Sequence, residues 1–430
     1  MVTLVILIFL YTLLQLLALP GIATALIILH RRRRGRDSMR ERLGFAPASP
    51  AKKHVFWLHA CSVGEVLSLQ ELITSIKERE PKTWVHVTVG TPNGRAMAEK
   101  HLAADRISYL PYDILPCMLL AYARIRPSRL VITEAEWWPM LFWVARLKKV
   151  PVILINARIS ARSAKRMLAL APFLRTMLAA CTRILTQHED EIARFKKLGV
   201  DARTLRTLGN IKAFNVQKKR LLYPAPTNLH HQPVLLAGSI HPTEETVYLE
   251  LFKQLKPQFP SLKLILVPRH FHWQEQLIAT TNRVTSSFAL WTANTPSTNV
   301  QEVLDRHDIL LVCRLGELFQ LYPHATLFFL GGTFVPVGGH NLLEPAVWHV
   351  PSMVGPYQAN CQDILQALRA VKGSIAAATS NELVLMVREL LSHPQELATM
   401  REANKQWIKK EAHRVEHAMR QELFSALFSC

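Results

Sequence analysis

The stretch HVFWLHACSVGE, residues 54–65, decides the fold. It is an apolar run of strand length that ends in small residues, after which Ser62 and Glu65 stand at the spacing of a helix start. The same strand-then-helix pattern recurs through the first half, with amphipathic stretches such as 65–78 and 189–198 between the strands. Strands are predicted at 54–59, 85–89, 107–110, 130–133, 152–155, 183–186 and 204–208. This alternation predicts a parallel sheet with right-handed crossovers and helices on both faces.

A second series of the same kind follows an interruption. Residues 216–232 mix Lys, Pro, Asn and His without apolar periodicity, which predicts a linker. Further strands are predicted at 234–238, 262–267, 309–312, 326–330 and 352–354, and residues 381–428 read as helical. We therefore expect two doubly wound, Rossmann-like domains, 31–215 and 233–430. A ligand cleft is expected between them, at the carboxyl ends of their strands.

The N-terminal segment reads as a membrane anchor. Residues 1–29 carry no charged side chain, and about 20 such residues can span a bilayer. A cleaved signal peptide has basic residues before its apolar run, whereas here Arg31–Arg34 come after it. A buried core helix would hardly be followed by four arginines in a row. We expect a retained anchor over residues 1–30, spanning or embedded in one leaflet, with the arginine block and the catalytic body on the cytoplasmic side.

Composition limits the classes of partner and cofactor. The chain of 430 residues has 52 Lys and Arg against 32 Asp and Glu, a net charge of +20. Such an excess favours nucleic acid, anionic lipid or phosphorylated substrates as partners, or is simply a solubilising surface. Six widely spaced cysteines without CxxC argue against a zinc site and a disulfide framework. No metal is expected. The absence of GxGxxG and GxxxxGK[ST] disfavours nicotinamide-dependent oxidoreductases and P-loop NTPases.

Acidic side chains follow two predicted strands. Glu65 would lie in the first turn of a helix, and the alternative to a functional role is a capping box with Ser62. Glu134 and Glu136 precede two tryptophans at the end of another strand. A carboxyl group buried between aromatic rings has a raised pKa or needs a cationic partner. We therefore predict Glu65 and Glu134 to be site residues.

Basic and glycine-rich segments follow other strands. Lys212 ends Gly-Asn-Ile-Lys, Ser239 lies in a strand–turn–helix start at 238–245, and Arg269 ends the strand LKLILVP. The glycines of 331–344 allow close approach of the backbone to a ligand, and Asn341 would cap a helix whose amino end attracts phosphate. Glu344 would bond ribose hydroxyls, or serve only as the reciprocal partner of the Asn cap.

With these segments in view, the chain resembles the 3-deoxy-D-manno-octulosonic acid (Kdo) transferases of lipopolysaccharide synthesis. The matching motifs run in order along nearly the whole chain. They are ERLG (41–44), HACSVGE (59–65), TPNG (91–94), YLPYD (109–113), EAEWWP (134–139), NARISARS (156–163), GNIK (209–212), PRH (268–270), LGEL (315–318), GGHNLLE (338–344) and GPYQAN (355–360). The sequence departs from the pattern of this family at residues 239–241, 271–273 and Tyr357. These departures concern the rim of the donor pocket.

The resemblance implies a GT-B fold with an N-terminal acceptor domain and a C-terminal donor domain. It implies transfer of Kdo from CMP-Kdo to the lipid A precursor (lipid IVA) at the inner membrane, without a cofactor or metal. Glu65 would be the general base, and Glu134 and Lys212 would support the transition state. The residues implied to bind CMP are Pro268, Arg269, Leu315, Gly316, Glu317, Asn341, Leu342, Leu343 and Glu344. Attack opposite the departing CMP, with one carboxylate as base, inverts the anomeric centre.

Two alternatives stay open. One is a GT-B transferase that uses another nucleotide sugar. The other is a non-catalytic basic module bound to the membrane, which explains the charge but not the glutamates at the strand ends. The partners expected are CMP-Kdo, the lipid A precursor and anionic lipid, and not nucleic acid.

Overall fold

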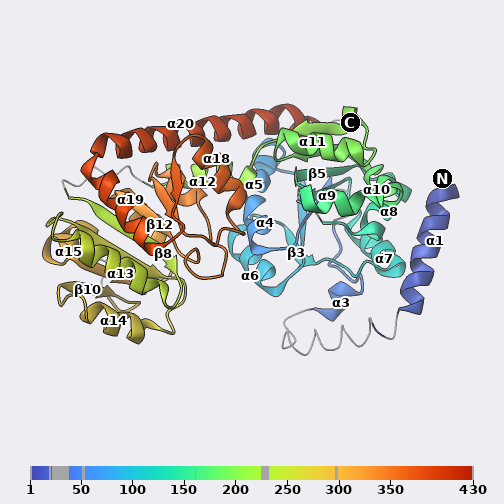
Figure 1. The fold of residues 1–430 in the computed structure, drawn as a ribbon. Helices are drawn as coiled ribbons and strands as arrows, with labels where there is room; N and C mark the ends of the chain where they lie inside the picture. The colour runs from blue at the N-terminus through green and yellow to red at the C-terminus, as the bar shows by residue number, and fades with distance from the viewer. Residues whose placement is uncertain are drawn as a thin grey trace. The chain divides into compact units, whose positions relative to one another are not determined.

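The computed structural model describes residues 2–18, 21, 38–50, 54–134, 136–159, 161–223, 232–295 and 299–428. These residues form two compact units, each with its own sheet (Figure 1). Unit 1 comprises Met1–Asn215 together with Ala412–Cys430, and unit 2 comprises Val216–Glu411. The sequence analysis placed everything from 233 to 430 in the second domain, so residues 412–430 are assigned differently by the structure.

The sheet of unit 1 has seven parallel strands in the order β3-β2-β1-β4-β5-β6-β7. The strands are β1 (Val55–Ala60), β2 (Trp84–Val89), β3 (Arg106–Tyr109), β4 (Arg129–Thr133), β5 (Val152–Ala157), β6 (Cys181–Thr186) and β7 (Leu205–Thr207). The chain moves outward from β1 to β3 and then returns to β4 on the other side of β1. The strand order therefore reverses between β1 and β4, where ligands of such folds bind.

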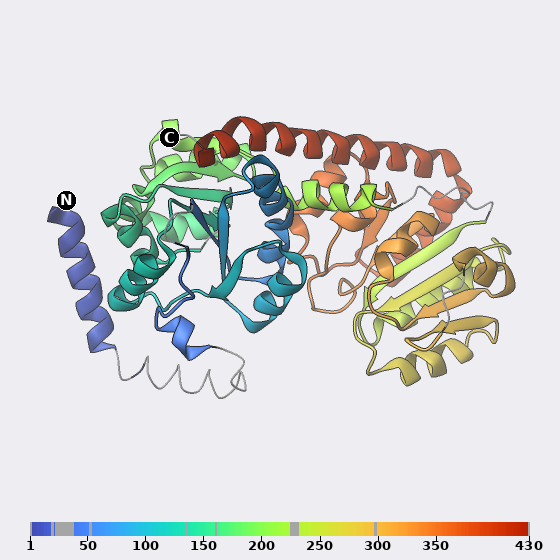
Figure 2. The same ribbon diagram turned by 180° about the vertical axis from the view of Figure 1, so that it is seen from behind.

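Helices cover both faces of this sheet, as predicted. Successive strand residues point to opposite faces, so Trp57 belongs to one buried cluster and Leu58 to the other. The Trp57 face is covered by α7 (Leu115–Ile125), α8 (Pro139–Leu147), α10 (Ala171–Leu178) and α11 (Glu189–Lys197). The Leu58 face is covered by α4 (Val63–Ser68), α5 (Gln70–Arg79) and α6 (Pro92–His101) (Figure 2).

The C-terminal helices complete the core of unit 1. The chain ends in three consecutive helical elements, which are α20 (Pro394–Ala418), η3 (Met419–Leu423) and α21 (Phe424–Phe428). Val415, Leu423 and Leu427 are almost fully buried in the cluster that also contains Val66 of α4. The helical pattern of this stretch could be predicted from the sequence, but its packing into the core of unit 1 could not.

Unit 2 also contains seven parallel strands, in the order β10-β11-β9-β8-β12-β13-β14. They are β8 (Val234–Ile240), β9 (Lys263–Pro268), β10 (Phe288–Trp291), β11 (Ile309–Val312), β12 (Leu327–Leu330), β13 (Ser352–Val354) and β14 (Ser374–Ala376). The sequence analysis missed β10 and β14. Both are edge strands of at most four residues and are only partly buried, so they lack the continuous apolar run of a central strand.

The helices of unit 2 follow its strands in alternation. They are α13 (Glu244–Leu255), α14 (Gln274–Asn282), α15 (Val300–Arg306), α16 (Leu318–Leu321), α17 (Leu343–Val347), α18 (Gln362–Ala370) and α19 (Ser380–Ser392). Part of the predicted linker is helical as well, because α12 (Ile211–Leu221) continues through residues 216–221. That stretch contains neither Pro nor Gly before residue 224, so nothing in it stops the helix. Residues 224–231 lie outside the described residues.

The N-terminal helix α1 (Val2–Leu17) packs against unit 1 along one face (Figure 1). Leu4 and Ile8 are buried in the cluster that contains α8. The Tyr11 hydroxyl donates to Asp113 Oδ2 at 3.2 Å, and Gln15 Nε2 donates to the Asp113 carbonyl at 2.6 Å. The other face exposes large apolar side chains: Val5, Ile6, Phe9, Leu10, Leu13, Leu14, Leu16 and Leu17.

A membrane-spanning helix was one of the two forms expected of the anchor. Within the part of the chain that the structure describes, no helix is both long and apolar enough to cross a bilayer. Residues 19–20 and 22–37, which include the rest of the predicted anchor and the arginine block, lie outside the described residues.

Candidate functional site

Glu65 and Glu134 lie at the carboxyl edge of the unit 1 sheet, on either side of the reversal in strand order. Glu65 lies in the first turn of α4, directly after β1, and Glu134 is the first residue after β4. Because β1 and β4 are adjacent parallel strands, their carboxyl ends meet at one edge. The topology thus brings two carboxylates that are 69 positions apart in the chain to one place.

Hydrogen bonds hold the Glu65 carboxylate at the start of α4. Ser62 Oγ donates to Oε1 at 2.7 Å, and the Cys61 backbone N–H donates to Oε2 at 2.8 Å. These contacts also fit the alternative interpretation, in which Glu65 serves only to cap the start of α4. They fix the carboxylate geometrically, which a general base requires. The residue is only 7% exposed, and this burial raises its pKa. The bonds from Cys61 and Ser62 oppose that rise, and the charges of Glu134 and Glu136 add to it.

Glu134 is held by a lysine and an amide. Lys212 Nζ lies 2.7 Å from Glu134 Oε1, and Asn156 Nδ2 donates to the same oxygen at 3.2 Å. Glu134 has φ +62° and Asn156 has φ +52°, both in the left-handed region that non-glycine residues seldom occupy. Such strain is retained where a side chain must point in one direction, and it gathers at functional sites.

Lys212 also lies next to the start of α4. A Cβ placed on Gly64 would lie 3.7 Å from Lys212 Nζ, which is van der Waals contact distance. The structure therefore brings Glu65, Glu134 and Lys212 together in unit 1.

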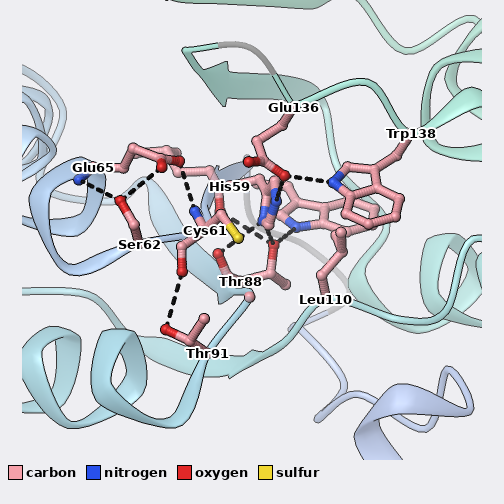
Figure 3. Close-up of polar contacts among 12 residues, drawn as sticks. His59, Cys61, Ser62, Glu65, Thr88, Thr91, Leu110, Glu136 and Trp138 are labelled. Carbon is pink, nitrogen blue, oxygen red and sulfur yellow. Dashed lines mark hydrogen bonds and ion pairs between the residues drawn. The ribbon is translucent and has the colours of Figure 1, made fainter. Parts of the chain in front are cut away.

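A third carboxylate, Glu136, lies beside Glu65 with a buried histidine beneath it (Figure 3). Trp138 Nε1 donates to Glu136 Oε2 at 2.6 Å, and His59 Nε2 lies 3.8 Å from the same oxygen. Burial raises the pKa of Glu136, but the bonds and charge of His59 and the bond from Trp138 outweigh it, and the pKa lies below its usual value. Cys61 lies between the two glutamates. Burial, with the charges of Glu136 and Glu65, raises the pKa of its thiol to about 12, so the thiol remains protonated.

A contact of the second ring nitrogen, Nδ1, fixes the orientation of His59. It is fully buried, and Nδ1 lies 3.0 Å from the Thr88 carbonyl oxygen, which can only accept. Nδ1 therefore carries the proton, and Nε2 faces Glu136 as a lone pair or, when the ring is cationic, as a second donor.

The Glu-Arg-Leu-Gly motif, residues 41–44, forms hydrogen bonds to the loops that follow β2 and β3. Buried Arg42 donates to the Leu110 carbonyl at 3.0 Å and to the Gly90 carbonyl at 2.7 Å. Glu41 Oε2 accepts from Arg95 at 2.7 Å and from the Tyr109 backbone N–H at 2.9 Å. These contacts tie α3 (Met39–Arg42) to the ends of β2 and β3, which is a structural role.

In unit 2 the strand order reverses between β8 and β12. The two loops that leave these strands are joined by the fully buried Glu244, which lies at the start of α13. Its carboxylate accepts from the backbone N–H groups of His241, Gly332, Thr333 and Phe334, at 2.7 to 3.0 Å. Gly331 permits this approach, because a Cβ there would lie 2.2 Å from the Ser239 carbonyl oxygen.

Two histidines face each other across these loops. His241 Nε2 lies 2.8 Å from His340 Nε2, and their rings are nearly parallel. Arg269 and His270 follow β9, and the ring of His270 lies 6.3 Å from that of His241. Burial lowers the pKa of His340 to about 4, with Arg269, His241 and His270 adding to the effect. The positive charge beside this pair comes from Arg269.

The residues implied to bind CMP lie in unit 2, at the end of β9, in loops or at helix starts. Pro268 ends β9, and Arg269 after it is exposed. After β11, Leu315 is 82% exposed, Gly316 has φ +91°, and Glu317 pairs with Arg314 at 2.9 Å. Asn341 Oδ1 accepts from the Leu343 backbone N–H at 2.9 Å, but the N-cap of the five-residue α17 is Leu342, one residue later than predicted. Leu342 and Leu343 are buried. Glu344 accepts from the Tyr322 hydroxyl at 3.5 Å, and its burial raises its pKa.

The sequence analysis did not predict as site residues several polar residues that the structure places at these edges. They are His59, Glu136, Asn156, His241, Glu244 and His340. All six stand inside segments that were named, so the signal available was a polar residue close to the end of a predicted strand. Among the described residues, no group of three or more His, Cys, Asp or Glu is arranged to hold a metal ion.

Known proteins similar to this chain agree on one family. A family model described as 3-deoxy-D-manno-octulosonic-acid transferase matches residues 37–215. The 3-deoxy-D-manno-octulosonic acid transferase of Chlamydophila psittaci is 31% identical over 366 residues, covering 83% of this chain and 82% of the relative. That of Haemophilus influenzae is 30% identical, covering 89% and 90%.

The fold has counterparts among solved structures. The UDP-GlcNAc 2-epimerase of Neisseria meningitidis, crystallised with UDP-GlcNAc, matches with a TM-score of 0.58 at 11% identity, covering 86% of this chain and all of that chain. At that identity the match bears on the fold alone, and it confirms the predicted GT-B architecture of two doubly wound domains. With relatives at 30% identity or more along most of its length, the chain belongs to the Kdo transferase family of glycosyltransferases.

Proposed function

We propose that this protein transfers Kdo from CMP-Kdo to a glucosamine lipid A precursor (lipid IVA), with inversion, and that Glu65 is the general base. The observation that carries the proposal is the position of Glu65. It is a buried, hydrogen-bonded carboxylate at the sheet edge where the strand order reverses, with Glu134, Glu136 and Lys212 around it. A rigid carboxylate with a raised pKa in such a crevice has the properties of a base that works near neutral pH.

The proposed reaction proceeds in one displacement. Glu65 removes the proton of an acceptor hydroxyl, and the oxygen forms a bond to the anomeric carbon of Kdo. The bond from that carbon to the phosphate oxygen of CMP breaks, and CMP leaves with the electron pair. Because the new bond forms opposite the old one, the anomeric centre inverts. Lys212 is proposed to support the transition state beside Glu134. Arg269 is proposed to stabilise the negative charge that develops on the departing CMP.

We further propose that the protein works at the cytoplasmic face of the inner membrane. Two features support this location: α1 exposes apolar side chains over its free face, and the chain carries a net charge of +20. A protein held there has access to a lipid acceptor. A variant with Phe9, Leu13 and Leu16 all changed to Glu should float less with anionic vesicles than the parent protein. Unchanged flotation of that variant would count against a role of α1 in binding.

The direct test is incubation with CMP-Kdo and a tetra-acylated lipid A precursor, followed by mass spectrometry of the lipid. A mass gain of one or more Kdo residues is expected, and the gain also gives the number transferred. Thermal unfolding with CMP or UDP separates the alternatives, because a bound nucleotide stabilises the folded state. Stabilisation by UDP and not by CMP would overturn the choice of donor. Absence of both binding and turnover would favour the non-catalytic module.

A further inference from the structure

The histidine pair of unit 2 has a property that the transfer reaction does not require. His241 follows β8 and His340 lies in the loop after β12, so the pair joins the two loops that diverge at the reversal of strand order. The Nε2 atoms lie 2.8 Å apart, which is a hydrogen-bond distance. Both side chains are partly buried.

This contact limits where protons can be. A hydrogen bond between two ring nitrogens needs one N–H and one lone pair, so one of the two Nε2 atoms is unprotonated. The ring that accepts is therefore neutral. The ring that donates can be neutral or, with a second proton on Nδ1, cationic. The pair can thus take up a single extra proton without losing its hydrogen bond.

The groups that face the pair disfavour uptake of this extra proton in the free protein. Burial lowers the pKa of His241 and lowers that of His340 to about 4. Arg269 and His270, from the loop after β9, lower both values further. Glu244 of α13 acts in the opposite direction on His241. On balance the pair is uncharged at neutral pH.

The backbone donors nearby are already occupied. Gly332, Thr333 and Phe334 present consecutive N–H groups, an arrangement that commonly binds phosphate. Here all three donate to the Glu244 carboxylate, at 2.7, 3.0 and 2.9 Å. Recognition of an anion at this edge therefore falls to side chains, namely Arg269 and the histidine pair.

We propose that the His241–His340 pair is a proton-coupled phosphate site, which takes up a proton when the phosphate of a nucleotide binds beside Arg269. A phosphate placed there adds negative charge next to the pair and so favours its cationic form. That the nucleotide is CMP rests on the proposed function. The coupling makes nucleotide binding tighter as the pH falls.

Proton uptake is measured by isothermal titration calorimetry of the full-length protein with CMP. At about pH 7.5 the phosphate of CMP is mostly a dianion, because its second pKa is about 6. The observed enthalpy is plotted against the ionisation enthalpy of several buffers, and the slope gives the protons taken up. We expect about one proton per CMP and a Kd that tightens up to about tenfold per unit decrease in pH. Cytidine, which lacks the phosphate, should take up none.

Two variants and a control assign the proton to the pair. His340→Asn and His241→Asn keep polar side chains that do not titrate, and each should bind CMP with a slope near zero. His393→Asn changes the exposed C-cap histidine that follows α19 and should retain the uptake of the parent protein. Thermal unfolding of each variant verifies folding, and the second pair variant serves if one of them fails to fold.

The outcomes separate this inference from the proposed function. CMP binding with a slope of zero in the parent protein overturns the proton-coupled site and leaves the proposed donor intact. Uptake that persists in both pair variants assigns the proton elsewhere and also overturns the inference. No CMP binding at any pH contradicts the proposed donor itself.

Discussion

Lys212 Nζ lies 2.7 Å from Glu134 Oε1, and this ion pair connects the start of α12 to the end of β4. Replacing Lys212 with Ala should lower kcat/KM by about 10²–10³-fold, the usual effect of removing one preorganised electrostatic group. Stability should change little, because an ion pair exposed to this degree contributes about 0–1 kcal/mol. Steady-state kinetics and thermal unfolding check both parts. Lys197→Ala, at an exposed position on α11, is the control. A Lys212→Ala enzyme with parental kcat/KM would remove this residue from the mechanism.

The backbone of Glu134 permits a test that separates strain from chemistry. At φ +62° an L side chain costs about 1–2 kcal/mol, whereas glycine adopts this conformation without that cost. Glu134→Ala and Glu134→Gly should both lose activity, because both lack the carboxylate. Glu134→Gly should nevertheless be the more stable of the two by about 1 kcal/mol. Urea unfolding measures this difference, and equal stability of the two variants would show that the position is unstrained.

Glu65→Gln should remove the base while leaving nucleotide binding intact. We expect turnover to fall by at least about 10²-fold, since positioned bases contribute about 10²–10⁴-fold. CMP affinity should be unchanged, because the predicted donor residues lie in unit 2. Glu78→Gln, an exposed position on α5, is the matched control. Parental turnover in Glu65→Gln would make the base assignment wrong.

The same substitution should stabilise the folded protein at neutral pH. Burial raises the pKa of Glu65 in the folded state above its unfolded value. A carboxyl with a raised folded pKa favours folding when protonated, and this contribution is lost as the pH rises through the folded pKa. Glutamine avoids that loss because it does not ionise. Thermal unfolding of the variant and the parent should therefore diverge as the pH rises from the unfolded to the folded pKa of Glu65, with the variant the more stable, and the difference should stay constant at higher pH.

Glu136 should influence the pH dependence of the reaction through Glu65. Its negative charge adds to the raised pKa of Glu65, so Glu136→Gln should lower that pKa. Because the base works only when ionised, the acidic limb of the kcat/KM profile should move to lower pH. Loss of activity without movement of the limb would give Glu136 a different role.

Much of the architecture could be predicted because central strands of parallel sheets are continuous apolar runs. Strands such as 152–155 and 309–312 carry that signal, whereas β10 and β14 are short and half-buried and do not. The proximity of Glu65 and Glu134 could be predicted because both follow parallel strands whose carboxyl ends meet at one edge of the sheet. The contact of His241 with His340 could not, because it joins positions 99 residues apart through a loop whose shape depends on Glu244. The sequence around one histidine does not indicate which distant residue it will contact.

The packing of residues 412–428 against α4 has a consequence for biosynthesis. Val415, Leu423 and Leu427 are translated after the whole of unit 2, yet they fill the same core as Val66, one position after Glu65. Unit 1 thus cannot finish folding before unit 2 has been translated, although the proposed residues Glu65, Glu134 and Lys212 have already been made. A nonsense mutation within residues 412–428 would spare each of those residues and still remove the support on which Glu65 rests.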